Sequence, residues 1–319
     1  MPPTATRLLV VSLCILALAA CTTTQESDRE TSVTTTEPQA TTTKALQTST
    51  SPSTIPATTQ PAEETQVGPP LVAGCRPDPF RGVSVSLASQ YAGRDLTAHV
   101  YDIRTGCEYA FNPENRQPTA SVFKVMVMAG TLLEAQQESR LPTEGEWNLM
   151  LPMITESANE PVRALWRSFG ASPWFRETGE AFGLSDTSIT ADGGSAWGAT
   201  RTSASDQVRL LRQVLLGEWG PLNEASRSLA LELMTSVVPD QAWGITSGVP
   251  SSWTVAQKNG FAGQIINSIG WVDPPGPEEG YVVAILTYGW PDHASGIAAV
   301  EHISRLVTDA MIDSVPGAR

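Results

Sequence analysis

The hydrophobic and polar positions divide this chain of 319 residues into three regions. Residues 8–20 form a short apolar run, and residues 22–70 consist mainly of Thr, Ser, Pro, Gln and Glu. From about residue 71 onward, apolar residues recur at spacings typical of helices and strands. The pattern therefore predicts a targeting segment, a segment without a core of its own, and one folded domain over 71–319.

The periodicity within the domain predicts two strands, a block of helices, three further strands and a last helix. The expected strands are 96–103, 108–113, 254–260, 264–273 and 281–289. The expected helices are 81–93, 121–137, 146–158, 161–170, 172–183, 204–217, 224–237 and 296–312. The segment 184–205 is rich in Gly, Ser and Thr and is predicted to be a loop. This order of elements predicts an α+β domain with one mainly antiparallel sheet.

The N-terminal region has the features of an export signal. Arg7 precedes an apolar run of about 13 residues, which is too short to span a bilayer. The run ends in Leu-Ala-Ala-Cys21, which resembles the lipobox of bacterial lipoproteins. The resemblance implies removal of residues 1–20 and lipidation of Cys21, with a plain secretory signal as the alternative. We therefore expect a protein anchored to the outer face of the bacterial cytoplasmic membrane or held elsewhere in the cell envelope.

Residues 21–70 cannot bury enough apolar surface to offset the entropy lost on ordering, so they are predicted to be a disordered tether. A flexible chain of this length has an end-to-end distance of roughly 35–40 Å. The tether would hold the domain away from the membrane surface.

The four cysteines divide between the N-terminal region and the domain. Cys14 would leave with the signal peptide and Cys21 would carry the lipid, which leaves Cys75 and Cys107. In an exported chain an isolated pair of this kind predicts one disulfide, with a catalytic cysteine as the alternative. Closing this loop would stabilise the domain by about 3–4 kcal/mol in the chain-entropy model.

Charge and histidine content exclude several classes of function. A net charge of −13 argues against nucleic acid as a partner. No two of the three histidines stand at the spacing of metal ligands, so no metal site is predicted. His99 falls in an expected strand and His302 in the last expected helix, where packing is the expected use, and His293 completes the set. A Ser-His-Asp triad is therefore not expected, and no G-x-S-x-G turn precedes a helix.

Lysine usage is the informative feature. Of twenty basic residues only Lys44, Lys124 and Lys258 are lysines. Arginine cannot lose its proton in a protein, whereas a buried lysine can, so a lysine base cannot be replaced by arginine. Lys124 follows Ser121 by three residues at the start of the apolar helix 121–137, which places both side chains on one helical face. The alternative is a helix cap followed by a surface lysine.

Two further motifs follow in order: Ser157-Ala158-Asn159 and Lys258-Asn259-Gly260. With Ser121-Val122-Phe123-Lys124, the set resembles the S-x-x-K, S-x-N and K-[TS]-G signature of the class A β-lactamase-like and penicillin-binding-protein-like serine hydrolases. The order of elements from residue 82 to residue 312 is also similar to that family. The resemblance implies an α+β β-lactamase-like fold, with a five-stranded antiparallel sheet flanked by helices and a mostly helical subdomain.

The resemblance also implies a role for each motif residue. Ser121 would be the acylated nucleophile and Lys124 its general base, and Ser157 would relay a proton to the leaving nitrogen. Asn159 would hold the substrate amide, while Lys258, Asn259 and Gly260 would bind the substrate and its carboxylate. The backbone N–H groups of Ser121 and Phe261 would form the oxyanion hole.

The sequence also departs from the pattern of that family. Ala158 replaces an acidic residue, and Asn259 replaces Thr or Ser, although its amide could still donate to a carboxylate. In class A β-lactamases a Glu in the omega loop activates the deacylating water. The corresponding residues, 184–202, contain no Glu, and their acidic residues are Asp186 and Asp192. Residues 218–223, Glu-Trp-Gly-Pro-Leu-Asn, are similar to the E-x-x-L-N motif of that omega loop. They have one residue too many and follow a later helix, so they are not taken as its equivalent. Since general-base assistance is worth roughly 10² to 10⁴ in rate, the sequence predicts slow deacylation.

We therefore expect an exported, membrane-anchored serine hydrolase that acts on peptidoglycan-derived peptides or on β-lactams. The alternative from another class is an inactive lipoprotein of the same fold that serves as a binding or scaffolding module in the cell envelope. A glutaminase-like amidohydrolase is a more distant alternative. No cofactor is implied, and a monomer is expected.

Overall fold

The computed structural model describes residues 74–188, 196–276 and 280–312. The predicted signal peptide, the lipidated Cys21 and the tether over 21–70 lie outside these ranges, as does Asp192. Those assignments remain predictions.

A five-stranded antiparallel sheet forms the centre of the domain, with strand order β2-β1-β7-β6-β5. The strands are β1 (Asp95–Asp102), β2 (Glu108–Phe111), β5 (Thr254–Ala262), β6 (Ile265–Asp273) and β7 (Tyr281–Tyr288). Two short strands, β3 (Gln117–Pro118) and β4 (Arg201–Thr202), pair in a separate small sheet. The predicted α+β fold with a five-stranded antiparallel sheet is confirmed.

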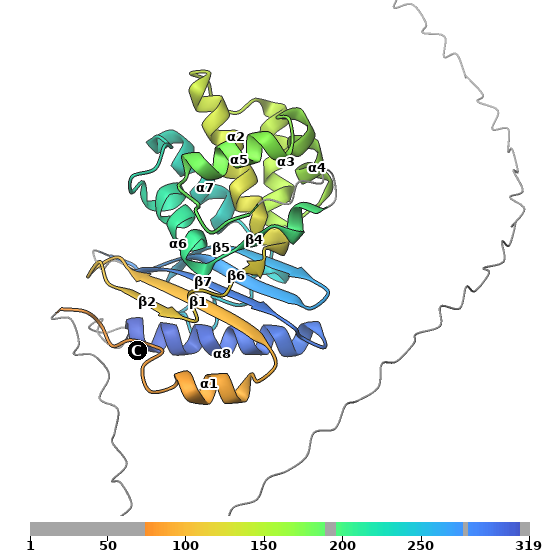
Figure 1. The fold of residues 1–319 in the computed structure, drawn as a ribbon. Coiled ribbons are helices and arrows are strands. Elements are labelled where there is room, and N and C mark those ends of the chain that lie inside the picture. Colours follow the sequence, from red (N-terminus) through yellow and green to blue (C-terminus); the bar gives the residue numbers. More distant parts are fainter. Residues whose placement is uncertain (1–73, 189–195, 277–279, 313–319) are drawn as a thin grey trace, which may run out of the picture. The chain divides into compact units, whose positions relative to one another are not determined.

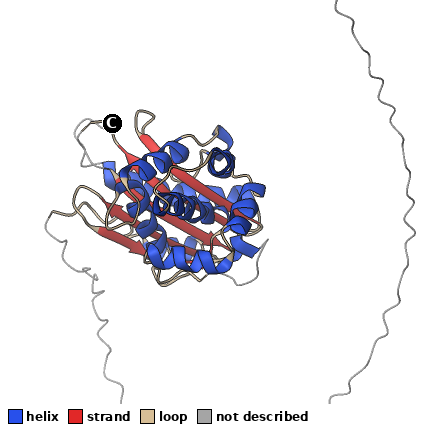
Figure 2. Cartoon of the chain, turned by 90° about the horizontal axis from the view of Figure 1, so that it is seen from above, coloured by secondary structure: helices blue, strands red, loops and turns tan. Residues whose placement is uncertain are grey.

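Helices cover both faces of the sheet (Figure 1). One face carries α1 (Ser84–Gln90) and the long C-terminal α8 (His293–Ile312). The other face carries α2 (Phe123–Gln137), α3 (Glu144–Thr155), α4 (Glu160–Ser168), α5 (Ser172–Ala181), α6 (Ala204–Leu211) and α7 (Glu224–Thr235). Seen from above, the helices of this second layer lie over the strands (Figure 2).

The sheet separates two hydrophobic cores. Because successive side chains of a strand point to opposite faces, Ala98 and Val100 of β1 join the core beneath α8, whereas Tyr101 joins the core of the helical layer. His99 shares the face of Tyr101 and therefore also points towards the helices. Burial on both faces explains why β1 is buried along nearly its whole length.

Helix α2 occupies the centre of the helical layer, as its uniformly apolar sequence predicts. Twelve of its fifteen residues are buried. The helix admits Trp174 at close range because Gly130 has no side chain: a Cβ atom there would lie 2.8 Å from the indole ring. Close packing of this kind fixes the position of the helix and of the residues at its start.

The predicted element boundaries needed local corrections. The segment 184–205, expected to be a loop, contains a short 3₁₀ helix, η2 (Ala196–Ala199), as well as β4. The helix expected over 204–217 is α-helical only to Leu211 and continues as a π-turn, η3 (Arg212–Leu216). These segments are only two to five residues long, which is too short to produce a recognisable hydrophobic periodicity.

Cys75 and Cys107 form a disulfide, with 5.8 Å between their Cα atoms. The predicted pairing is confirmed. The bond joins the segment before α1 to the turn between β1 and β2. Among the residues that the structure describes, no helix is both long and apolar enough to cross a membrane.

Candidate active site

Ser121 lies in a single 3₁₀ turn, η1 (Ala120–Val122), immediately before α2. Its hydroxyl does not cap the helix. Instead, Oγ of Ser121 lies 2.8 Å from Nζ of Lys124, which follows in the first turn of α2. Ala120 has a φ of 44°, an uncommon conformation for a residue with a side chain. The structure therefore places the serine and lysine in direct contact and rules out the interpretation as a helix cap and a surface lysine.

Lys124 is completely buried. Its Nζ contacts Oγ of Ser121, the carbonyl oxygen of Ser157 at 2.6 Å, Oγ of Ser157 at 3.1 Å and Oδ1 of Asn159 at 2.9 Å. Burial lowers the pKa of Lys124 from its ordinary value near 10.5 to about 7. A substantial fraction of the amine is therefore neutral at pH 7 and able to accept a proton from Ser121.

Ser157 joins the two buried lysines. Its Oγ lies 3.1 Å from Nζ of Lys124 and 2.9 Å from Nζ of Lys258, which comes from β5. Burial, together with the positive charge of Lys124, holds the pKa of Lys258 well below its ordinary range. Ser157 itself has a φ of 62°, so the chain adopts an uncommon backbone conformation at the serine that bridges the two amines.

Gly260 allows β5 to approach the start of α2. A Cβ atom at this position would lie 2.8 Å from the carbonyl oxygen of Thr119, 2.8 Å from the backbone nitrogen of Val122 and 2.9 Å from that of Ser121. Real side chains do not tolerate such distances, so only glycine permits this contact. The close approach also brings the next residue, Phe261, to the cleft beside Ser121. The predicted oxyanion hole at the N–H groups of Ser121 and Phe261 stays a prediction.

Asn259 differs from its expected orientation. Its side chain lies on the opposite face of β5 from Lys258, and Nδ2 donates to the carbonyl oxygens of Gln241, at 2.7 Å, and Trp243, at 3.0 Å. Both amide hydrogens are thus used to fix the loop that precedes β5. In this structure the amide is not available to donate to a substrate carboxylate.

The site opens into a cleft of about 430 Å³. Its lining is largely apolar, with Arg163 as the charged member: Pro118, Ala120, Ser121, Asn159, Arg163, Trp197, Gly198, Ala199, Phe261, Ala262 and Ile265. The sequence pattern predicted no functional role for Arg163 or Trp197. Arg163 follows Asn159 by one helical turn, and this spacing could have indicated it; Trp197 is an isolated aromatic residue in a loop of small residues.

The ring of Trp197 lies beside the amine of Lys124. Nζ of Lys124 is 5.2 Å from the centre of the Trp197 ring, which also stacks on Phe123 with 5.8 Å between ring centres. No Asp or Glu of the described residues lines the cleft, and the pKa of Lys124 is lowered by burial without a carboxylate to oppose it. Asp186 is exposed and outside the lining, and Glu218 is engaged elsewhere, by the Tyr101 hydroxyl and by an ion pair with Arg212.

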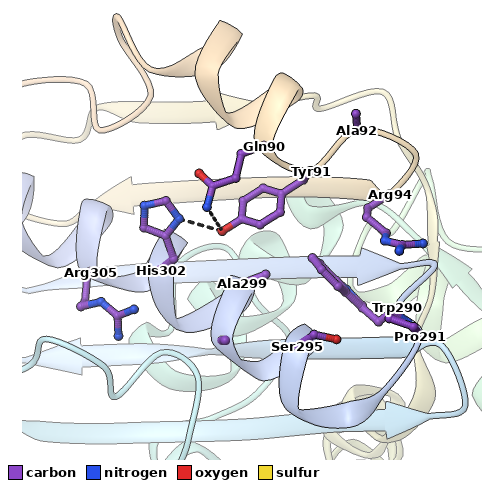
Figure 3. A pocket seen from close by; sticks show the side chains of 11 residues that line it. Gln90, Tyr91, Ala92, Arg94, Trp290, Pro291, Ser295, Ala299, His302 and Arg305 are labelled. Atoms are coloured by element: carbon purple, nitrogen blue, oxygen red, sulfur yellow. Dashed lines mark hydrogen bonds between the residues drawn. The ribbon is translucent and has the colours of Figure 1, made fainter.

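A larger cavity, of about 640 Å³, lies between α1 and α8 on the opposite face of the sheet (Figure 3). It contains Arg94, Arg305 and a hydrogen bond of 2.7 Å between the Tyr91 hydroxyl and Nδ1 of His302. Its serine, Ser295, donates to a backbone carbonyl of its own helix turn instead of to a base. Size therefore does not identify the active site, and the chemistry favours the smaller cleft at Ser121. The described ranges contain no cluster of three His, Cys, Asp or Glu side chains suited to a metal ion.

An α+β sandwich with a serine beside a buried lysine at the start of its central helix is the architecture of the penicillin-recognising serine enzymes. The sequence model of the Beta-lactamase enzyme family matches residues 83–144 and 147–311. The chain belongs to that family. No protein with a curated description matches the sequence.

Solved structures of the same fold are distant in sequence. PBP-A superposes with a TM-score of 0.65 at 18% identity, covering 75% of this chain and 100% of PBP-A. A PBP-A mutant, solved as its acyl-enzyme complex with penicillin G, has a TM-score of 0.64 at 19% identity, with 72% and 95% covered. A β-lactamase from Burkholderia phymatum gives 0.62 at 19% identity, with 72% and 96% covered. At these identities the similarities establish the fold.

Proposed function

We propose that this protein is a serine hydrolase that forms an acyl-enzyme on Ser121 with amides of cell-envelope peptides or with β-lactams. The contact of 2.8 Å between Oγ of Ser121 and Nζ of Lys124 supports the proposal most directly. A serine hydroxyl is a weak nucleophile until a base removes its proton. A lysine whose pKa has fallen to about 7 is such a base under physiological conditions.

In the proposed acylation step, Lys124 accepts the proton of Ser121 as Oγ attacks the carbonyl carbon of the amide. Ser157 then delivers a proton to the departing nitrogen and is reprotonated through the lysines that it contacts. Asn159 lines the cleft and its Oδ1 accepts a hydrogen bond from Lys124, which supports a role for its amide nitrogen in binding the substrate. The first-turn N–H groups beside Ser121 favour the oxyanion.

Support for the substrate class comes from the relatives and from charge. A PBP-A mutant of the same fold was solved as an acyl-enzyme with penicillin G. β-Lactams and muropeptide stems both carry a carboxylate near the reactive amide. Arg163 lines the cleft on the α4 side and offers this carboxylate a positive charge that it shares with Glu160, its ion-pair partner. Lys258 lies behind Ser157 and would attract the carboxylate only in its protonated form.

We expect the acyl-enzyme to be long-lived. Deacylation requires a base that activates water. The Trp197 ring lies beside Lys124, and no carboxylate of the described residues lines the cleft. Loss of such a base typically slows a step by about 10² to 10⁴. The proposed protein thus behaves more like a penicillin-binding protein than like an efficient β-lactamase.

The test is to incubate the domain over residues 71–319 with a fluorescent penicillin and to follow covalent labelling by gel and mass spectrometry. Labelling should occur on Ser121 and be lost in Ser121→Ala and Lys124→Ala. Ser86→Ala, an exposed serine on α1, is the matched control and should be labelled as the wild type is. A wild-type domain that gains no adduct would instead favour a non-catalytic binding module of the same fold.

Membrane anchoring through a lipid on Cys21 belongs to the same proposal. The Leu-Ala-Ala-Cys motif supports it. Cys21→Ala should move the protein from the membrane fraction to the soluble fraction. A variant that stays with the membrane would contradict lipid anchoring at this residue.

A further inference from the structure

A separate cavity of about 400 Å³ lies where α6 packs over β1, and Glu108 of β2 also lines it. One face of α6 and its continuation η3 contributes four residues at helical spacing: Ser205, Val208, Arg209 and Arg212. The strands contribute His99 and Glu108, and Trp219 completes the lining. None of these residues lines the cleft at Ser121.

Three of the lining residues form a continuous hydrogen-bonded chain. Nδ1 of His99 lies 2.7 Å from Oγ of Ser205, and Nε2 of His99 lies 3.1 Å from Oε2 of Glu108. His99 and Glu108 come from the adjacent strands β1 and β2, nine residues apart, whereas Ser205 comes from α6, 106 residues after His99. The sequence pattern placed His99 in a strand, where packing was the expected use.

Charge around Glu108 determines which nitrogen of His99 carries the proton. Arg212 donates to Oε1 of Glu108 at 2.6 Å. The hydrogen bond from His99, followed by the positive charges of His99 and Arg212, lowers the pKa of Glu108 to about 2 despite its partial burial. An ionised carboxylate only accepts hydrogen bonds, so in the neutral form of His99 the nitrogen Nε2 is the donor. Nδ1 then has the free lone pair and accepts the hydroxyl proton of Ser205.

Ser205 also occupies a favourable position on its helix. It is the second residue of α6, and Ser203 caps the helix by accepting from the backbone nitrogen of Asp206 at 3.1 Å. The backbone N–H groups of Ala204 and Ser205 belong to the first turn, where no intrahelical carbonyl is available to them. Such groups stabilise negative charge that develops beside the start of a helix.

We propose that Ser205, His99 and Glu108 form a second serine-nucleophile site, which hydrolyses small carboxylic esters that carry a negatively charged group. Ser205 and His99 are its catalytic residues, and Glu108 positions His99. Arg209 extends from the same helical face, lines the cavity and interacts electrostatically with Asp206 of that helix, and we assign it to bind the charged group. The site does not depend on acylation of Ser121.

Each half of the reaction balances through His99. As Oγ of Ser205 bonds to the acyl carbon, its proton passes to Nδ1 of His99 and then to the alcohol oxygen, whose bond to carbon breaks. Water next attacks the acyl-serine and gives its proton to His99, which returns a proton to Oγ as the carboxylic acid leaves. Glu108 stays ionised throughout and stabilises the transient imidazolium.

Accessibility distinguishes this arrangement from a purely structural network. The Glu108 side chain is 47% exposed and that of His99 is 11% exposed, and Ser205 lines the cavity itself. A reagent that enters the cavity therefore meets the hydroxyl and the imidazole together. A network that only fastens α6 to the sheet would show no chemical reactivity at Ser205.

The test uses a Ser121→Ala domain, which removes the nucleophile of the first site. A fluorophosphonate probe should modify Ser205, with loss of fluoride, and peptide mass spectrometry should locate the adduct there. Ser121→Ala/Ser205→Ala should lose the adduct, and Ser121→Ala/His99→Gln should react at least 100-fold more slowly. Absence of any adduct on Ser205 in the folded Ser121→Ala domain overturns the proposal, whatever the variants do.

Ester hydrolysis tests the substrate class. In the Ser121→Ala domain, kcat/KM should be higher for p-nitrophenyl hemisuccinate than for p-nitrophenyl acetate, and Arg209→Ala should remove that preference. An unchanged preference in Arg209→Ala would contradict the anion-binding role. Glu108→Gln should lower kcat with little change in KM, as expected for a residue that acts through His99; an unchanged kcat would exclude Glu108 from the site.

These outcomes are distinguishable from those for Ser121. A penicillin adduct on Ser121 without a fluorophosphonate adduct on Ser205 would support only the first proposal. The reverse pattern would support only the second.

Discussion

The two serines differ in how the fold supplies a base. Ser121 contacts a completely buried lysine, whose pKa falls to about 7 because burial disfavours its charged form. Ser205 contacts an imidazole in a partly open cavity, where an ionised carboxylate orients the ring. Burial lowers the pKa of the first proposed base, whereas a neighbouring charge orients the second. The two sites should therefore respond differently to the same changes.

The largest expected effect comes from Lys124→Arg. Arginine keeps the positive charge and much of the volume but cannot become neutral. Acylation of Ser121 by penicillin should fall by about 10² to 10⁴. Fluorophosphonate modification of Ser205 in the same protein should be unchanged. A variant that still acylates at the wild-type rate would show that Lys124 is not the base.

Removal of the disulfide should lower the stability of the domain and the reactivity of Ser205. Cys75→Ser/Cys107→Ser should lower the free energy of unfolding by about 3–4 kcal/mol, measured by urea denaturation. Cys107 directly precedes Glu108 in β2, so reactivity of Ser205 should also fall, while penicillin acylation of the remaining folded protein should not. Equal losses at both serines would mean that the bond supports the domain as a whole.

The pH dependence of acylation should report the lysine. Because the neutral amine is the base and the pKa of Lys124 is about 7, the acylation rate should rise with pH up to about 7 and then level off. Between pH 7 and pH 5 the rate should fall by roughly fifty- to a hundredfold, since each pH unit below the pKa reduces the neutral fraction about tenfold. A rate that is flat from pH 5 to pH 8 would contradict the role of Lys124.

A smaller effect is expected from Gly260→Ala. The added methyl group would meet backbone atoms of Thr119 and Val122 at 2.8 Å, so β5 would have to move away from Ser121. We expect a loss of about 1–3 kcal/mol in the free energy of unfolding and slower penicillin acylation. Gly145→Ala is the matched control, because its nearest neighbour would lie at 3.9 Å. Ser205 should react normally in both variants.

Sequence patterns predicted the fold well because the signals involved are long. The apolar helix 121–137 and the strands at 254–260 and 281–289 each extend over several residues of consistent pattern, and all three form where expected. The segment 184–205 was predicted less well. Its 3₁₀ helix and its two-residue strand depend on contacts with β3 and η1, which lie far away in the sequence.

The candidate site shows the same division. Ser121 and Lys124 could be paired from sequence, because a separation of three residues near a helix start leaves little freedom. The orientation of Asn259 could not, because it depends on carbonyl groups of a loop 16 and 18 residues earlier in the chain. Trp197 likewise reaches Lys124 only after the helical layer has packed.

The sequence by itself therefore determined the family, the local pair at the start of α2 and the disulfide, since each depends on residue type, order or short spacing. The tertiary structure decided which side chains share a hydrogen bond across the fold. It placed Ser157 between two lysines and brought Ser205, His99 and Glu108 into one cavity. The contacts of Ser157 and Ser205 follow from the packing of β5 and α6 against neighbouring elements, and no spacing along the chain encodes those distances. His99 and Glu108 lie nine residues apart in the adjacent strands β1 and β2.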